Sequence, residues 1–421
     1  MGEVVGHAIM MARRGRERNP GCAAIAGRAR VGAVIDDGDL RTTEIVPELL
    51  RGAVDHERSA RGMRPHRLPA WARARADQQL LMAQSQPSGV RLVFRTSATR
   101  LEVDAHRTTL AFAGAPRRPD GRWDLVVDGE LVARATSTGG TVLVTDLAAG
   151  TTQVQEGPVG TVAFTDLPAG EKHVELWLPH QEATELVALR SDAPVVPAVG
   201  SRPVWLHHGS SISQGSNAES PSTTWAALAA ARGGVELVNL GFSGSAMLDP
   251  FVARVVRDQP ADLLSAEIGI NLVNADVMRM RAFTPAVHGF LDTIRDGHPT
   301  TPLLVVSPVL CPIHEATPGP GAVDIADGTL RFRATGDPAD VAAGRLCLRT
   351  IREELARLVV ERAVDDPHLH LLDGLALYGE PDAVEHPLPD RLHPDAATHR
   401  LMGERFAALA FGDGGPFRSP G

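Results

Sequence analysis

The sequence predicts an α/β protein in which an antiparallel β-sandwich precedes a doubly wound parallel sheet of five strands. Between residues 86 and 195, apolar and polar residues alternate in short runs, and turn residues separate these runs about every 8 to 12 positions. This spacing is typical of an antiparallel sandwich with one solvent-facing side. After Pro203 the pattern changes to repeated strand, loop and helix, which is typical of a parallel sheet covered by helices on both faces.

Length and composition allow two or three domains and exclude several classes of protein. The chain has 421 residues, of which 43% are hydrophobic and 22% charged, as in globular proteins with domains of about 150 residues. The net charge of −9 disfavours nucleic acid as a partner, and no apolar run reaches the roughly 18 to 20 residues of a membrane-spanning helix. The N-terminus lacks the charged-then-apolar order of a signal peptide, so we expect a cytoplasmic protein. Cys22, Cys311 and Cys347 form no C-x-x-C pair, which argues against a disulfide framework and a zinc ribbon.

The first part of the chain is expected to hold a lead-in and the sandwich. Residues 1–85 show little periodicity, so we assign them to a lead-in or to the start of the sandwich domain, with a helix expected around 71–81. The pair Asp128-Gly129 lies between two apolar pairs, as a two-residue hairpin with positive φ requires. The stretch 194–203, rich in Pro and Gly, is expected to be a linker. A jelly-roll-like sandwich is expected over 86–195, with strands near 90–94, 101–103, 125–127, 142–144, 162–164 and 174–178.

The second domain, expected over residues 203–421, carries the parallel sheet. In such sheets ligands bind at the carboxyl ends of the strands, so functional residues are expected on the loops that follow them. The expected strands cover 204–208, 235–240, 262–268, 303–307 and 369–372, and the expected helices cover 224–231, 276–295, 342–362 and 396–411.

The loop after the first of these strands combines small residues with hydroxyl groups. Residues 209–215 read Gly-Ser-Ser-Ile-Ser-Gln-Gly. At a strand-to-helix turn such residues let a serine oxygen stand exposed, while the N–H groups of the following helix point into the same space. Taken alone, the segment is better explained as an ordinary turn that caps a helix.

Three later loops carry further candidate groups. In 239–246 and 269–271, a glycine lets the backbone approach a ligand closely and an asparagine supplies a neutral N–H donor. Near the C-terminus Asp390 lies three residues before His393, so its carboxylate can accept from Nδ1 of the imidazole and leave the other nitrogen free as a base. The alternative is that Asp390 caps a turn and His393 is merely exposed.

Taken together, these four loops resemble the SGNH hydrolases, also called GDSL esterases. A serine, a glycine, an asparagine and an Asp-x-x-His motif follow the first, second, third and fifth strands in the order that this family uses, over residues 203–411. The first two blocks are most similar to a branch with Gly-Ser-Ser-Ile-Thr/Ser and Asn-Leu-Gly-Phe-Ser-Gly, in which a β-sandwich precedes the hydrolase domain. The resemblance implies a flavodoxin-like sheet and ester hydrolysis.

The resemblance also implies a role for each matching residue. Ser211 corresponds to the nucleophile, His393 to the general base and Asp390 to the acid that orients the base. The N–H groups of Ser211 and Gly244 and the side chain of Asn271 correspond to the oxyanion hole. The chemistry of this family uses neither a metal nor an organic cofactor.

Two positions depart from the family pattern. Many members have Asp before the nucleophile, where this chain has Ser210, and Asp after the asparagine, where this chain has Leu272. Neither change removes a group that the reaction requires. Both indicate that the hydrogen bonding around the site is reorganised, so rate and specificity do not transfer from typical members.

Other candidate nucleophiles and metal ligands fit less well. Around Ser243 the G-x-S-x-G pattern of the α/β-hydrolases is broken at Ser245. Cys311 precedes His314 and Glu315, but a loop cysteine is not a nucleophile by default, and the segment does not continue as H-E-x-x-H. We expect His314 and Glu315 to line the substrate pocket instead.

Two further features of the sequence each allow two interpretations. His207 and His208 end the first strand, where one of them must point into the core, and His208 is retained as a candidate contact with substrate. The segment 312–340 is rich in Gly, Pro and Asp and longer than an ordinary connection, so it is either a lid or a surface insertion.

The sequence therefore predicts a serine esterase that hydrolyses a small-molecule ester through an acyl-enzyme on Ser211. An acetyl or short acyl group on a sugar or related metabolite is the expected substrate, by analogy with two-domain sugar deacetylases of the family. A lipase or thioesterase for longer acyl chains is the alternative among enzymes. A carbohydrate-binding protein that has lost activity is the alternative outside them.

Overall fold

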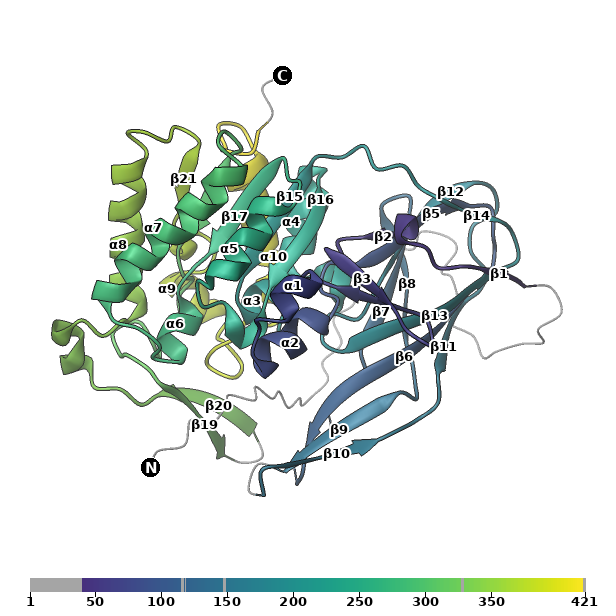
Figure 1. Ribbon diagram of the computed structural model, residues 1–421, viewed down its shortest axis with the longest axis horizontal. Coiled ribbons are helices and arrows are strands. Elements are labelled where there is room, and N and C mark those ends of the chain that lie inside the picture. Colours follow the sequence, from purple (N-terminus) through teal and green to yellow (C-terminus); the bar gives the residue numbers. More distant parts are fainter. Residues whose placement is uncertain (1–39, 115–116, 118, 147–148, 327–328, 419–421) are drawn as a thin grey trace.

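The computed structural model describes residues 40–418, apart from 115–116, 118, 147–148 and 327–328. Cys22 and the first 39 residues of the expected lead-in lie outside the described residues. The rest of the chain forms a sandwich half, up to residue 197, and an α/β half from residue 204 onward, which lie side by side (Figure 1).

The sandwich half consists of two mostly antiparallel sheets around one apolar core. Its strands are β1 Arg41–Thr43, β2 Leu50–Arg51, β3 Asp55–Arg58, β4 Met63–His66, β5 Arg91–Thr96, β6 Leu101–Phe112, β7 Arg122–Val127, β8 Glu130–Thr136, β9 Thr141–Asp146, β10 Thr151–Gln155, β11 Gly160–Phe164, β12 Lys172–Trp177, β13 Ala183–Ser191 and β14 Val195–Pro197. One sheet has the order β10-β9-β6-β13-β4-β3, with β1 beside β13 and β11 beside β6; the other has the order β14-β5-β12-β7-β8, with β2 beside β5. Strand β9 is parallel to β6, and the chain reaches it from β8 in the other sheet. Phe94, Trp123 and Phe164 lie fully buried in the shared core.

Two local expectations for the sandwich have different outcomes. Asp128 and Gly129 join β7 to β8 as a two-residue hairpin with positive φ values of 50° and 88°, which confirms the expected turn. The expectation that 194–203 is a linker is wrong in its first part, because Val195–Pro197 form β14 and pair with β5. A proline fits there because β14 is an edge strand.

The segment between β4 and β5 is helical but not as one helix. The helix expected around 71–81 is instead α1 Ala70–Arg73 followed by α2 Gln78–Ser85. The second helix starts after Asp77, whose carboxylate accepts a backbone N–H of the first turn at 2.8 Å. This cap competes with a continuous helix because it requires an extended backbone at Asp77.

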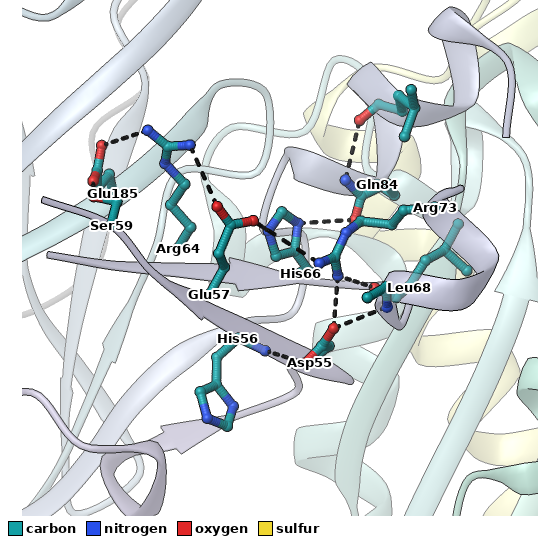
Figure 2. Close-up of polar contacts among 12 residues, drawn as sticks. Asp55, His56, Glu57, Ser59, Arg64, His66, Leu68, Arg73, Gln84 and Glu185 are labelled. Carbon is teal, nitrogen blue, oxygen red and sulfur yellow. Dashed lines mark hydrogen bonds and ion pairs between the residues drawn. The ribbon is translucent and has the colours of Figure 1, made fainter. Parts of the chain in front are cut away.

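Polar contacts hold α1 and α2 against β3 and β4 (Figure 2), and apolar contacts tie the same segment to the α/β half. Asp55 of β3 accepts from the guanidinium of Arg73 at 2.7 Å and from the N–H of Ala70 at 3.0 Å. On β4, Nδ1 of His66 lies 3.2 Å from Oε1 of Gln84 in α2. Apolar residues of the same segment belong to the core of the α/β half, namely Leu68, Ala72, Leu80 and Ala83. The described part of the expected lead-in therefore bridges the two halves.

The α/β half contains a parallel sheet of five strands. These are β15 Val204–Gly209, β16 Glu236–Gly241, β17 Leu263–Glu267, β18 Leu303–Val306 and β21 Leu369–Leu372. Their order, β16-β15-β17-β18-β21, is the 2-1-3-4-5 order of flavodoxin-like folds, which confirms the predicted fold class. In such folds ligands bind where the strand order reverses, which here lies between the carboxyl ends of β15 and β17.

Helices cover both faces of this sheet, as expected. The helices are α3 Ser211–Gln214, α4 Trp225–Gly233, α5 Pro250–Asp258, α6 Ile270–Asn274, α7 Met280–Gly297, α8 Leu348–Arg362, α9 Glu380–Glu385 and α10 Ala396–Phe406. Helices α4 and α10 share one apolar cluster with the sheet, while α5, α7 and α8 share the other. The sequence did not predict α5, and α8 starts later than expected because residues 338–343 form a 3₁₀ turn. No helix among the described residues is long and apolar enough to cross a membrane.

Candidate active site

Three side chains from distant parts of the sequence meet at the carboxyl edge of the parallel sheet. Nε2 of His393 lies 3.0 Å from Oγ of Ser211, and Nδ1 of His393 lies 2.8 Å from Oδ2 of Asp390. Ser211 begins α3 directly after β15, while Asp390 and His393 lie in the turn before α10. Ser211, Asp390 and His393 are 3%, 6% and 0% exposed. The structure thus places His393 within hydrogen-bond distance of both Ser211 and Asp390.

The Asp-x-x-His turn determines which nitrogen of His393 can act as a base. Oδ1 of Asp390 accepts the N–H groups of Leu392 and His393 at 2.9 and 2.7 Å, and Arg391 closes the turn with a φ of 70°. Burial opposes ionisation of Asp390, but the charge of His393 and these hydrogen bonds outweigh burial and lower the pKa of Asp390. An ionised carboxylate only accepts, so Nδ1 carries the imidazole proton. Nε2 therefore turns its lone pair toward the Ser211 hydroxyl.

A second buried carboxyl group holds the first turn of the nucleophile helix. Ser210 is the N-cap of α3, and its hydroxyl accepts the N–H of Ile212 at 3.3 Å. The N–H of Ser210 donates to Oε2 of Glu267 at 2.9 Å, and the hydroxyl of Ser213 lies 3.4 Å from the same oxygen. Burial raises the pKa of Glu267. Glu267 was missed by the sequence analysis, although a carboxyl residue that ends an otherwise uncharged, buried strand was a usable signal.

Gly244 and Asn271 lie on the loops that follow β16 and β17. Gly244 is buried in the 3₁₀ turn Ser243–Ser245, whose first residue has a φ of 51°. Asn271 lies in the first turn of α6, and its Oδ1 accepts the N–H of Ala246 at 3.1 Å. This bond joins the two loops and directs Nδ2 of Asn271, a hydrogen-bond donor, away from the N–H of Ala246. The expected oxyanion donors therefore lie on adjacent loops at the edge of the sheet where α3 begins.

Close packing beneath α3 explains a glycine of the second sequence block. Gly241 ends β16, and a Cβ at this position would lie 2.4 Å from the backbone nitrogen of Gln214 and 2.7 Å from the carbonyl carbon of Ser213. A larger residue would push α3 away from the sheet. The requirement for glycine follows from this contact and not from a turn.

The two histidines that end β15 face opposite helix layers. The ring of His208 lies between Phe242 and Phe290, with centroids 5.8 and 5.6 Å away, and its Nδ1 lies 2.9 Å from a carbonyl oxygen of β16. Burial lowers the pKa of His208 to about 4. The expectation that His208 contacts substrate is therefore not supported, because its ring faces the core. His207 is buried on the other face, against Trp225.

His314 and Glu315 make internal contacts in the loop after β18. His314 is fully buried, with Nδ1 3.2 Å from the carbonyl oxygen three residues later and Nε2 3.3 Å from Oδ1 of Asn274. Glu315 accepts the N–H of Cys311 at 3.2 Å and pairs with Arg352 of α8. The expectation that both residues line the substrate pocket is not supported, because their polar groups hold the loop together. Burial raises the pKa of the Cys311 thiol, which agrees with a structural cysteine.

The long segment 312–340 packs against His393 and Asp390. It contains the hairpin of β19 Gly321–Ala326 and β20 Thr329–Ala334, in which Phe332 is fully buried. The ring of Phe332 meets the ring of His393 edge-on at 5.4 Å between centroids, and its N–H donates to the carbonyl oxygen of Asp390 at 2.9 Å. The segment is therefore a wall of the site, and Phe332 is a site residue that the sequence analysis missed.

Comparisons with known proteins show a family match and a similar structure. Residues 202–311 match the GDSL-like lipase/acylhydrolase family. The chain is similar to the structure of the salicylyl-acyltransferase SsfX3 from a tetracycline biosynthetic pathway, with 29% identity and a TM-score of 0.69, over 91% of this chain and 96% of the other. No curated protein sequence matches the chain.

Two more distant structures share the fold. One, assigned as a GDSL-like lipase from Bacteroides ovatus, has 18% identity and a TM-score of 0.62, over 88% of this chain and 98% of its own. The other, an acetyl xylan esterase from the rumen bacterium Butyrivibrio proteoclasticus, has 12% identity and a TM-score of 0.51, over 90% and 100%. These two structures show the fold, while the family match lies within residues 202–311 of the α/β half.

Proposed function

We propose that the protein is a serine esterase that cleaves a small carboxylic ester through an acyl-enzyme on Ser211. The observation that carries the proposal is the hydrogen-bonded series from Asp390 through His393 to Ser211, with distances of 2.8 and 3.0 Å. The match to an acylhydrolase family supports it independently.

The proposed chemistry follows from the protonation of the triad. Oγ of Ser211 attacks the ester carbonyl carbon while Nε2 of His393 takes the hydroxyl proton, because a serine hydroxyl is a poor nucleophile without such a base. The bond to the alcohol then breaks, and His393 protonates the leaving oxygen. Water repeats the cycle on the acyl-enzyme, which releases the acid and restores the hydroxyl of Ser211. Asp390 stays ionised throughout and stabilises the imidazolium.

Three N–H groups are proposed to stabilise the oxyanion. They are the backbone N–H of Ser211 at the start of α3, the N–H of Gly244 and Nδ2 of Asn271. The bond from Ala246 to Oδ1 of Asn271 keeps Nδ2 available as the donor. Each such donor is typically worth about 10²- to 10³-fold in rate.

Esters of acetyl or other short acyl groups, with a sugar or related metabolite as the alcohol, are the proposed substrates. The near-complete burial of Ser211 and His393 and the contact of Phe332 with His393 support a short acyl group. A long acyl chain would need an extended apolar surface that reaches the nucleophile.

Acyl transfer to an alcohol is a second candidate function. It is favoured by the similarity to the salicylyl-acyltransferase, which extends over both halves of this chain. Transfer and hydrolysis differ only in what attacks the acyl-enzyme, and His393 would activate an alcohol as it activates water. A buried triad favours transfer because it limits the access of water.

Hydrolysis of p-nitrophenyl acetate, butyrate and octanoate tests the proposal. We expect activity on acetate, a loss of at least about 10³-fold in Ser211→Ala and no change in Ser201→Ala, whose serine is exposed before β15. Equal rates for wild type and Ser211→Ala would rule out the esterase. A preference for octanoate would instead support the alternative of a lipase or thioesterase.

Two further measurements separate the remaining alternatives. An alkyl fluorophosphonate should label the peptide that contains Ser211 in the wild type and not in Ser211→Ala, whereas a non-catalytic carbohydrate-binding protein would stay unlabelled. Adding glycerol to the acetate assay separates transfer from hydrolysis, because transfer gives a glyceryl ester in place of acetic acid.

A further inference from the structure

Side chains cap four successive carbonyl oxygens at the C-terminal end of the nucleophile helix. Helix α3 has only four residues, and the last carbonyl groups of a helix have no partner within it. A helix this short is not stable alone, so its position depends on the groups that hold its ends. The capping bonds are Asn239 Nδ2 to Ser213 O at 2.9 Å, Ser88 Oγ to Gln214 O at 2.7 Å, His180 Nε2 to Gly215 O at 2.9 Å and His399 Nε2 to Ser216 O at 2.8 Å.

Two of these four donors come from the sandwich half. Ser88 lies just before β5, and His180 lies between β12 and β13. Ser88 is fully buried, and Nδ2 of Asn239 donates to its oxygen at 3.0 Å. That bond leaves the proton of Ser88 for the carbonyl oxygen of Gln214, so the direction of the cap is fixed.

The two capping histidines are neutral donors. Burial lowers the pKa of His180 and of His399 to about 4, so each ring has one N–H at neutral pH. The N–H of Trp225 donates to Nδ1 of His399 at 3.3 Å, which places the proton of His399 on Nε2. Nε2 of His180 faces the carbonyl oxygen of Gly215, which only accepts, so this nitrogen also carries the proton.

Arg67 joins the end of β16 to the end of α3. Its guanidinium is fully buried and donates to the carbonyl oxygens of Asn239 at 3.1 Å and of Gly241, to Oε1 of Gln214 at 3.2 Å and to the carbonyl oxygen of Ala83. Burial lowers the pKa of Arg67 to about 9. A buried cation is costly unless hydrogen bonds compensate it, and two of these bonds go to the end of β16, which leads into the loop that holds Gly244.

We propose that the sandwich half positions the nucleophile, with Ser88, His180 and Arg67 as positioning residues. They hold one end of α3 so that Oγ of Ser211, at the other end of the same short helix, stays within reach of Nε2 of His393. This inference rests on the proposed role of Ser211. Misplacement of a reacting group by about 1 Å can lower a rate about 100-fold, so loss of the cap acts directly on the chemical step.

Replacements of His180 test the inference. His180→Leu removes the donor at similar size, whereas His180→Gln keeps an N–H near the position of Nε2. With p-nitrophenyl acetate we expect kcat to fall about 10- to 100-fold in His180→Leu, with KM within about twofold, and to recover largely in His180→Gln. Ser88→Ala, a smaller change, should lower kcat about 10-fold. Fluorophosphonate labelling of Ser211 should slow in parallel.

Thr96→Val is the matched control. The hydroxyl of Thr96 donates to the carbonyl oxygen of Pro194 at 2.9 Å inside the sandwich, away from α3. This variant should lose comparable stability and keep the kcat of the wild type. If His180→Leu does not fold, Ser88→Ala decides the question.

Two outcomes overturn the inference. One is a folded His180→Leu or Ser88→Ala with the kcat of the wild type, with folding judged by circular dichroism and Tm. The other is a His180→Gln variant as slow as His180→Leu. Failure of the proposed function looks different, because wild type and Ser211→Ala would then hydrolyse the ester at equal rates.

Discussion

Two buried carboxyl groups flank the nucleophile helix, and the groups that they face differ. Asp390 faces the imidazole of His393, whose charge and hydrogen bonds lower the pKa of Asp390 against the effect of burial. Glu267 faces the N–H of Ser210 and the hydroxyl of Ser213, neither of which becomes positively charged, and burial raises its pKa. Asp390 can therefore respond to charge that appears during the reaction, whereas Glu267 can only hold the backbone in place.

Glu267 ends a series of hydrogen bonds that joins β15, β17 and α3. Trp205 can only donate, and burial lowers the pKa of His207 to about 3, which keeps that ring neutral. With Glu267 as acceptor, each bond then has one consistent direction. Trp205 Nε1 donates to Ser265 Oγ at 2.8 Å, and this hydroxyl donates to His207 Nδ1 at 2.7 Å. His207 Nε2 then donates to Ser213 Oγ at 2.7 Å, and that hydroxyl donates to Glu267 Oε2 at 3.4 Å.

The site thus has two sides with different tasks. The reacting side consists of Asp390, His393 and Ser211 with the oxyanion donors. The supporting side consists of the series that ends at Glu267 together with the cap at the other end of α3. Charge changes on the reacting side during catalysis, while the supporting side fixes geometry through hydrogen bonds, most of them between neutral groups and one set from the guanidinium of Arg67.

The largest expected effect belongs to the reacting side. Asp390→Asn keeps an oxygen for the N–H groups of Leu392 and His393 but removes the charge that faces the imidazole. We expect kcat to fall about 10³- to 10⁴-fold with little change in the free energy of unfolding. Steady-state kinetics and urea denaturation measure the two quantities. A loss of kcat below tenfold would show that the charge of Asp390 is not needed.

The next effect concerns the oxyanion. Asn271→Ala removes Nδ2 as a donor, and we expect kcat to fall about 10²- to 10³-fold while KM changes little. Asn271→Asp is the control, because it keeps an oxygen for the N–H of Ala246 and still lacks the donor. Both variants should lose activity together. An active Asn271→Asp would mean that Asn271 acts only by joining the two loops.

Much of the reacting side could be predicted because its groups lie in local sequence patterns, either on loops that follow strands or, for Asp390 and His393, in the turn before α10. A parallel sheet brings the carboxyl ends of its strands to one edge, so the order of the motifs implied that Ser211, Asn271 and His393 lie near one another. The five strands were equally visible as apolar runs. Apart from Glu267, which ends an otherwise uncharged strand, the supporting side gave no such signal, since Ser88 and His180 act on backbone carbonyls, which every residue has.

Other parts escaped prediction for related reasons. Phe332 lies on a hairpin whose contact with His393 depends on tertiary packing alone. The helices at 70–85 were merged into one because the cap at Asp77 depends on a single side chain. The sequence left the role of His208 open because two adjacent histidines on a strand do not reveal what lies on either face of the sheet; both are buried here.

A third effect belongs to the supporting side and concerns stability at acid pH. His180 and His399 have a pKa of about 4 in the folded chain, against 6.5 as the ordinary value. Between these values the unfolded chain binds more protons, so the free energy of unfolding falls as the pH drops from about 6.5 to 4. We expect a loss of up to about 3 kcal/mol for each histidine. Urea denaturation at several pH values measures it, and His180→Gln should reduce the slope by the share of one histidine.

The smallest expected effect tests whether Glu267 differs from Asp390 as described. Glu267→Gln keeps an oxygen for the N–H of Ser210 and the hydroxyl of Ser213 but cannot ionise. Because neither partner carries a charge, we expect kcat within about tenfold of the wild type and an unchanged pH profile. Glu267→Leu leaves the buried N–H of Ser210 without a partner, which should cost about 1 to 3 kcal/mol of stability and lower kcat further.

The outcome for Glu267→Gln decides between two accounts of this carboxyl group. If its kcat falls as far as that of Asp390→Asn, the charge of Glu267 takes part in the reaction. The supporting side would then contribute charge as well as hydrogen bonds. If only Glu267→Leu is impaired, the hydrogen bond to Ser210 is what matters. In that case the glutamate acts at the first turn of α3 as Ser88 and His180 are proposed to act at its end.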